Sequence, residues 1–338
     1  MEEKKVTWLE LFYDLLIVAA ISTATHVLLH VEKGYIHSDY LLKFVLIFIP
    51  IWWAWVGQTM FINRYGEDLF HHRIFLILQM FFALIMIASL SVDFDSYYRS
   101  FLIGYIGLRA LVVIQYLVVQ LCSLFFDSWI RYLILYTGIL VDILIPIIGR
   151  KRLVNVPTNT AHLFERFGLF TIILFGETLV STLAVIQPKQ GDWNSILFTI
   201  VSFVLIISMW WQYFDNLEKK VNKSIKTAGQ MIIYGHLFIL MSLSMIAASI
   251  RLLFMHEVNY YFILFFVFGS VLLYFLSTSI VFHQYRYKKQ RLKIYHLGLF
   301  LGILVGFLIL NLIISVPNIL IMVELIVFFV IYAKLTTV

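Results

Sequence analysis

Long apolar stretches follow one another through the whole chain, and short polar segments separate them. A helix needs about 20 mostly apolar residues to cross the hydrocarbon core of a bilayer. Hydrophobic residues make up 62% of the sequence, above the roughly 45–50% of a soluble domain. The run 196–209 does not alternate in polarity, as a strand of a membrane barrel would. The sequence therefore predicts an all-α, polytopic membrane helix bundle.

Ten or eleven transmembrane helices are expected from these stretches. The ten longer ones cover residues 6–31, 40–62, 73–92, 100–126, 128–148, 163–187, 194–215, 229–253, 259–283 and 295–315. A shorter eleventh helix is expected at 318–334. Because no loop is long enough for a soluble domain, any activity must lie within the membrane or at its faces.

The two halves of the chain resemble each other in the spacing between a glutamate and a tryptophan pair. The spacing is 42 residues from Glu10 to Trp52 and 45 residues from Glu165 to Trp210. Five helices per repeat would place the second copy inverted in the membrane. Chance is the alternative, because paired aromatics are common at membrane interfaces. The sequence predicts a first repeat at 1–148, a second at 163–315 and an extra helix at 316–338.

Basic residues are concentrated in three loops, at 150–152, 219–226 and 286–293. By the positive-inside rule these loops face the cytoplasm. Counting back through five helices then places the amino terminus outside. Lys4, Lys5, Arg64 and Arg73 favour the opposite orientation.

Several classes of chemistry lack their motifs. Cys122 is the only cysteine, which excludes an intrachain disulfide or a cluster of thiolate ligands. There is no His-Glu-x-x-His sequence and no phosphate-binding glycine loop; Gly104 and Gly107 fit helix packing instead. We therefore expect no metal, no cofactor and no catalytic residue. The net charge of +6 is explained by the basic loops, so the expected partners are the lipid bilayer and a small solute or ion, not nucleic acid.

Four segments and one histidine carry a family resemblance. They are WLELFYD at 8–14, WWAWVGQTMFINRY at 52–65, ERFGLFTIILFGE at 165–177, WWQYFD at 210–215, and His236. Together they resemble the bacterial low-temperature-requirement A family. The resemblance implies a multi-pass protein of the bacterial plasma membrane that is associated with growth in the cold, and it implies no particular reaction.

Acidic residues in the first predicted helix are the leading candidates for a substrate or ion site. Glu10 and Asp14 are four residues apart and share one helix face. Like-charged acids inside a membrane are typical of ion or proton sites, although a structural ion pair is the alternative. Arg166 and Glu177 lie eleven residues apart, about 16 Å along a helix, so they cannot pair. Arg166 could neutralise Glu10 or Asp14 if the first helices of the two halves pack together.

Two further charges are expected inside the membrane. Arg109 lies in the predicted fourth helix and Asp142 in the fifth, and pairing them would offset the cost of burying each. A purely structural pair is an equal alternative. The secondary candidates, for which a solvated loop or hydrogen-bonded packing is the alternative role, are His26, Asn63, Arg64, Asp68, Asp215 and His236.

Three functions fit this pattern. A secondary transporter or ion-coupled carrier is favoured by the intramembrane acids and the apparent repeat. A membrane enzyme that acts on a lipid headgroup would need its acids gathered at one interface. A non-catalytic membrane scaffold or sensor would use the charges for folding alone.

Overall fold

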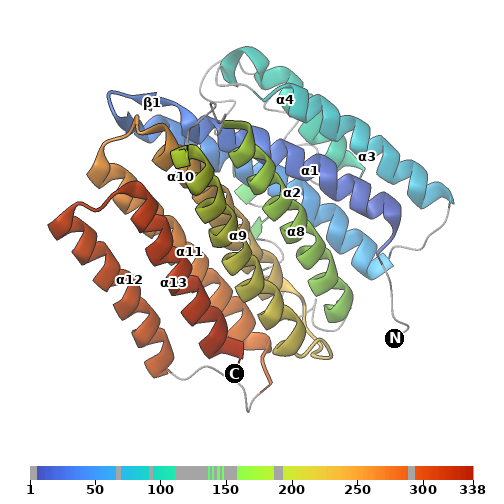
Figure 1. Cartoon of the computed structure of the whole chain (residues 1–338). Helices are drawn as coiled ribbons and strands as arrows, with labels where there is room; N and C mark the ends of the chain where they lie inside the picture. The colour runs from blue at the N-terminus through green and yellow to red at the C-terminus, as the bar shows by residue number, and fades with distance from the viewer. Residues whose placement is uncertain are drawn as a thin grey trace. The chain divides into compact units, whose positions relative to one another are not determined.

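The computed structural model describes residues 6–65, 70–90, 94–111, 158–185, 193–287 and 294–337, with a few more between 136 and 147. These residues form ten α-helices, a short 3-10 helix and one hairpin, shown in Figure 1. The helices are α1 (Trp8–His26), α2 (Ser38–Tyr65), α3 (Phe70–Ala88), α4 (Phe94–Ala110), α8 (Thr160–Val185), α9 (Trp193–Lys219), α10 (Gln230–Met255), α11 (Tyr260–Tyr285), α12 (Ile294–Ile314) and α13 (Asn318–Thr337). The 3-10 helix η1 (Val27–Leu29) continues α1, and strands β1 (Val31–Glu32) and β2 (Tyr35–Ile36) pair antiparallel before α2.

Seven of the described helices are long and apolar enough to cross a membrane: α1 with its 3-10 extension, α2, α9, α10, α11, α12 and α13. A shorter apolar helix covers Arg73–Ala88. The prediction of an all-α, polytopic membrane bundle is confirmed. α4 begins at Phe94, before the predicted helix 100–126, and ends at Ala110. Residues 112–126 of that prediction lie outside the described residues.

Two compact units divide the chain. Unit 1 comprises Met1–Ala24, Lys43–Phe170 and Ser224–Ile233, and unit 2 comprises Thr25–Leu42, Thr171–Lys223 and Tyr234–Val338. Among the described residues, unit 1 therefore holds most of α1 and α2, all of α3 and α4, and the first part of α8. Unit 2 holds the hairpin, the rest of α8, α9, most of α10, and α11 to α13.

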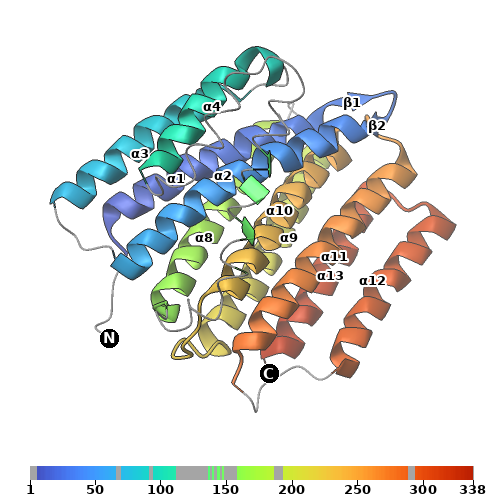
Figure 2. The ribbon, with the colours of Figure 1, turned by 180° about the vertical axis from the view of Figure 1, so that it is seen from behind.

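Close helix packing in unit 1 depends on glycine. α3 and α4 lie side by side in Figure 2. A Cβ atom added at Gly104 would lie 2.6 Å from the backbone nitrogen of Met86 and 2.8 Å from the carbonyl oxygen of Phe82. Backbone atoms cannot move aside as a flexible side chain can, so only glycine fits. The packing role expected for Gly104 is confirmed.

Aromatic packing fills much of unit 2. Tyr332 on α13 lies with its ring centroid 5.1 Å from that of Phe275 on α11 and 4.8 Å from that of Phe300 on α12. All three side chains are buried. These contacts join α11, α12 and α13, which lie side by side in Figures 1 and 2.

Candidate functional site

Helices α1 and α8 both begin with a side-chain cap, and these caps position the site. Thr7 Oγ1 accepts a hydrogen bond from the Glu10 backbone N–H at 3.3 Å, and Glu10 Oε1 accepts one from the Thr7 backbone N–H at 3.4 Å, which is a capping box. Asn159 Oδ1 accepts from the His162 backbone N–H at 3.1 Å. Glu10 and His162 therefore occupy the same position, three residues after the cap, in their two helices.

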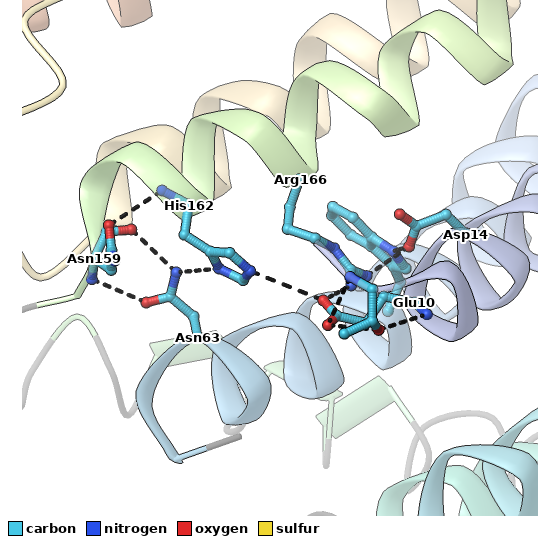
Figure 3. Close-up of polar contacts among 8 residues, drawn as sticks. Glu10, Asp14, Asn63, Asn159, His162 and Arg166 are labelled. Carbon is cyan, nitrogen blue, oxygen red and sulfur yellow. Dashed lines mark hydrogen bonds and ion pairs between the residues drawn. The ribbon is translucent and has the colours of Figure 1, made fainter. Parts of the chain in front are cut away.

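A single guanidinium binds both acids of α1. Arg166 donates through Nη1 to Glu10 Oε2 and through Nη2 to Asp14 Oδ1, the latter at 2.6 Å, as Figure 3 shows. Arg166 and Asp14 are fully buried, and Glu10 is 3% exposed. The predicted ion pair between Arg166 and an acid of the first helix is confirmed, with both acids engaged.

A tryptophan completes the contacts of Asp14. Trp55 on α2 donates from Nε1 to Asp14 Oδ1 at 2.7 Å. Its ring centroid lies 4.9 Å from that of Phe167 and 4.4 Å from that of Phe170, both on α8. Trp55 therefore joins α1, α2 and α8 through one side chain. We call Glu10, Asp14, Trp55, His162 and Arg166 the charge cluster.

Polar residues at the helix ends adjoin the charge cluster. Asn63, near the end of α2, accepts from the Asn159 backbone N–H and donates to the Asn159 carbonyl oxygen, each at 3.1 Å. Its Nδ2 atom also lies 3.0 Å from His162 Nδ1. His162 Nε2 in turn lies 3.9 Å from Glu10 Oε2, as Figure 3 shows. Polar groups therefore extend from the end of α2 to the buried acids, with a gap longer than a hydrogen bond between His162 and Glu10.

The charge cluster holds two carboxylates and one guanidinium. Asp14 Oδ2 is buried and has no hydrogen-bond partner among the residues that the structure describes. The same is true of the Tyr13 hydroxyl, Gln58 Oε1 and Thr59 Oγ1 within the described part of unit 1. Buried polar atoms almost always have partners in folded proteins, whether protein groups or water. Asp14 Oδ2 is therefore an acceptor that a proton or a water molecule could satisfy.

The contacts also fix the direction of the helices. Glu10 faces His162, and Asp14 faces Arg166, so residue numbers rise together along α1 and α8. The two helices therefore run parallel. In an inverted repeat the equivalent helices run in opposite directions across the membrane, so these contacts speak against the inverted form of the predicted repeat. They are consistent with a parallel repeat, and the repeat itself stays a prediction.

Arg109 is buried on α4, with an exposed fraction of 5%. Its guanidinium carbon lies 6.0 Å from the ring centroid of Trp53, and its charge acts on Tyr13, which is also within electrostatic range of Asp14 and Arg166. The predicted partner Asp142 lies outside the described residues, as do Asp68 and the side chain of Arg64.

Glu177 does not join the charge cluster. It lies eleven residues beyond Arg166 on α8, about 16 Å along the helix, and belongs to unit 2. There its charge acts on His26 at the end of α1 and on Arg251 on α10. The sequence candidates therefore fall into two separate groups of charges.

The remaining candidates have local partners in unit 2. Asp215 pairs with Lys219 at 2.8 Å, one helical turn away, and accepts from Trp211 Nε1 at 2.9 Å. His236 is fully buried and its Nε2 atom lies 2.8 Å from the Tyr213 hydroxyl. Both arrangements match the structural roles that were the alternatives for these residues.

Sequence reasoning missed His162 and the bond from Trp55. Two patterns could have indicated where the site residues lie: Thr7-x-x-Glu10 and Asn159-x-x-His162 each mark the start of a helix. The contact between Trp55 and Asp14 joins residues 41 positions apart, so no local pattern predicts it.

Comparison with known proteins places the chain in one family. The sequence model of the family described as "Bacterial low temperature requirement A protein (LtrA)" matches residues 5–122 and 117–333. The chain belongs to this family. Its seven apolar helices make this LtrA-family protein a multi-pass membrane protein, and the predicted family is confirmed.

A relative in Rhizobium meliloti (strain 1021) bears the name "Uncharacterized protein RA0937". It is 24% identical to this LtrA-family protein over 283 residues, which cover 70% of the chain and 66% of the relative. The chain thus spans slightly less than two thirds of the length of that relative.

Proposed function

We propose that this protein is a proton-coupled secondary transporter and that the charge cluster holds the coupling proton. One observation carries the proposal: two buried carboxylates share a single arginine, and Asp14 Oδ2 has no partner among the described residues. An unpaired charge in a low-dielectric interior is costly, and neutralisation removes that cost. A proton on Asp14 would leave one carboxylate opposite one guanidinium.

The same proton would couple the ionisation of Asp14 to movement of α1. Ionised Asp14 binds α8 through Arg166 and α2 through Trp55. Protonation replaces a charge-assisted bond to Arg166 with a weaker neutral one, so α1 is held less tightly against its two neighbours. A carrier must alternate between two conformations. The ionised and protonated forms of Asp14, which differ in these contacts, would favour different conformations.

We further propose that a solute binds beside the cluster. Tyr13 and Asp14 are adjacent on α1, while Gln58 and Thr59 follow Trp55 on α2. Their buried polar atoms without described partners offer a hydroxyl, an amide oxygen and a second hydroxyl. These groups suit a small polar solute that both donates and accepts hydrogen bonds.

The parallel course of α1 and α8 revises the orientation. The amino-terminal end of α8 lies beside the loop after α9, because the Thr158 backbone N–H donates to Thr227 O at 3.0 Å. The end of the basic loop 219–226 therefore shares a face with the start of α8 and, because α1 runs parallel to α8, with the start of α1. By the positive-inside rule we place this face, the amino terminus and the charge cluster on the cytoplasmic side of the bacterial plasma membrane, in place of the outside amino terminus first expected.

Complementation of cold growth tests the proposal. A strain that lacks the gene would receive the wild type, Asp14→Asn, Glu177→Gln or the exposed-site control Glu218→Gln, with protein amount and unfolding midpoint measured for each. The proposal predicts that Asp14→Asn accumulates normally and fails to restore growth, while Glu218→Gln restores it. Full restoration by Asp14→Asn would contradict the proposal and leave the cluster a purely structural role.

A further inference from the structure

The orientation of one side-chain amide is fixed by a backbone group. The Asn159 backbone N–H can only donate, so the atom of Asn63 that faces it at 3.1 Å must be the acceptor Oδ1. The other end of the same amide faces the Asn159 carbonyl oxygen, which can only accept. Both contacts require the same orientation, so Asn63 Nδ2 must be the atom that faces His162 Nδ1 at 3.0 Å.

This orientation determines where His162 carries its proton. An amide nitrogen has no lone pair to offer, so His162 Nδ1 must accept the bond from Asn63. A neutral imidazole that accepts at Nδ1 carries its hydrogen on Nε2. The Nε2–H group lies toward Glu10 Oε2, 3.9 Å away, which is too long for a hydrogen bond in the state that the structure shows.

The surroundings of His162 also disfavour its charged form. A second proton on Nδ1 would face the N–H group of Asn63, so two donors would meet in a buried site. Among the described residues, Glu10 on α1 and Asn63 on α2 face the imidazole, and Arg166, which binds Glu10, lies one turn further along α8. The positive Arg166 opposes a second cation, and the Glu10 carboxylate that would favour one is already bound to Arg166.

We infer that Asn63 and Asn159 hold His162 in the neutral Nε2–H tautomer, so that His162 is a positioning residue and the exchangeable proton of the cluster resides on its carboxylates. The tautomer of His162 follows from the contacts alone, whereas the role of the carboxylate proton in coupling rests on the proposed function. It gives Glu10 two alternative partners: Arg166, which binds it in this structure, and the Nε2–H of His162.

Nitrogen NMR of the purified protein tests the inference directly. Histidine would be labelled with nitrogen-15, and the signals of His162 assigned by their loss in His162→Gln. We expect an unprotonated Nδ1 and a protonated Nε2, unchanged across roughly pH 6 to 8, the range in which an ordinary histidine titrates. An imidazolium, or the Nδ1–H tautomer, in the wild type would overturn the inference.

A charge-changing variant of Asn63 should move the proton of His162 to the other ring nitrogen. In Asn63→Asp the new carboxylate can still accept from the Asn159 backbone N–H, but it can only accept from His162. We expect the proton of His162 to appear on Nδ1 in this variant. An unchanged Nε2–H spectrum in a folded Asn63→Asp protein would show that Asn63 does not set the tautomer.

The two proposals can fail separately. Restoration of cold growth by Asp14→Asn would remove the transport proposal and leave the wild-type histidine spectrum as predicted. A titrating His162 would remove this inference and leave the requirement for Asp14 intact.

Discussion

Arg166 on α8 donates through Nη2 to Asp14 Oδ1 on α1 at 2.6 Å, and neither side chain reaches solvent. The same guanidinium binds Glu10. A fork of fixed donors can bind two carboxylates on adjacent turns of one helix, which a point charge cannot do as well. This relationship joins the starts of two helices more than 150 residues apart in sequence and sets the charge balance of the site.

Removal of the arginine should destabilise the protein severely. Arg166→Leu leaves two carboxylates buried together, and loss of one partner from a buried ion pair costs about 3–5 kcal/mol. Unfolding in a denaturing detergent, followed by circular dichroism, measures the change. The triple variant Glu10→Gln, Asp14→Asn, Arg166→Leu carries no buried charge here and should recover a large part of the loss; equal destabilisation of both would contradict the ion-pair account.

Trp55→Phe isolates the hydrogen bond to Asp14. Phenylalanine keeps a ring against Phe167 and Phe170 but loses the Nε1 donor to Asp14. A hydrogen bond to a charged group contributes about 1.5–3 kcal/mol, so the unfolding free energy should fall by an amount in this range. Trp193, which is 76% exposed, provides the control: Trp193→Phe should leave the unfolding midpoint where it is.

Gly104→Ala tests the contact between α3 and α4. The added methyl group would meet backbone atoms of Met86 and Phe82, and overpacking of this kind costs about 1–3 kcal/mol. Gly302→Ala on α12 meets no atom within 4 Å, so it should be neutral or slightly stabilising. Equal unfolding midpoints for the two variants would show that α3 and α4 can move apart at Gly104 without a loss of stability.

Disrupting a buried hydrogen-bond network in unit 2 should destabilise the protein more than breaking an ion pair at its surface. Asn216 accepts a hydrogen bond from Arg286 and donates to Thr336 Oγ1 at 3.1 Å. Asn216→Leu leaves Arg286 without this acceptor, and an unsatisfied buried group costs about 1–3 kcal/mol. Lys219→Gln breaks the pair with Asp215, in which the lysine side chain is 58% exposed, and should cost under about 0.5 kcal/mol. A larger loss of unfolding free energy in Lys219→Gln than in Asn216→Leu would contradict this prediction.

The sequence predicted most of the fold because bilayer thickness limits helix length. Observed helices such as α9 and α11 begin and end within a few residues of the predicted ranges. Apolarity alone does not mark a helix end inside an apolar run, and so the end of α4 at Ala110 was not predicted. Helix direction also depends on pairing across the bundle, and the parallel course of α1 and α8 emerged only from the contacts of Arg166 and His162.

The site could be predicted where burial of charge forces a partner. Arg166 needed a partner on that ground, and the apparent repeat of the two halves suggested the acids of α1. The role of His162 depends on the orientation of the Asn63 amide, which a backbone group of Asn159 sets. Such a role cannot be read from residue types or spacing. Glu177, which resembles the other acids in sequence, lies with His26 and Arg251 because of its position three turns along α8.

Proton binding at Asp14 is the central claim, and infrared spectroscopy of the purified protein during a pH titration tests it most directly. The account predicts that the wild type gains a protonated-carboxyl stretching band from a buried group as the pH falls, that Asp14→Asn lacks this band, and that Glu218→Gln keeps it. An identical band and titration in wild type and Asp14→Asn would contradict the account.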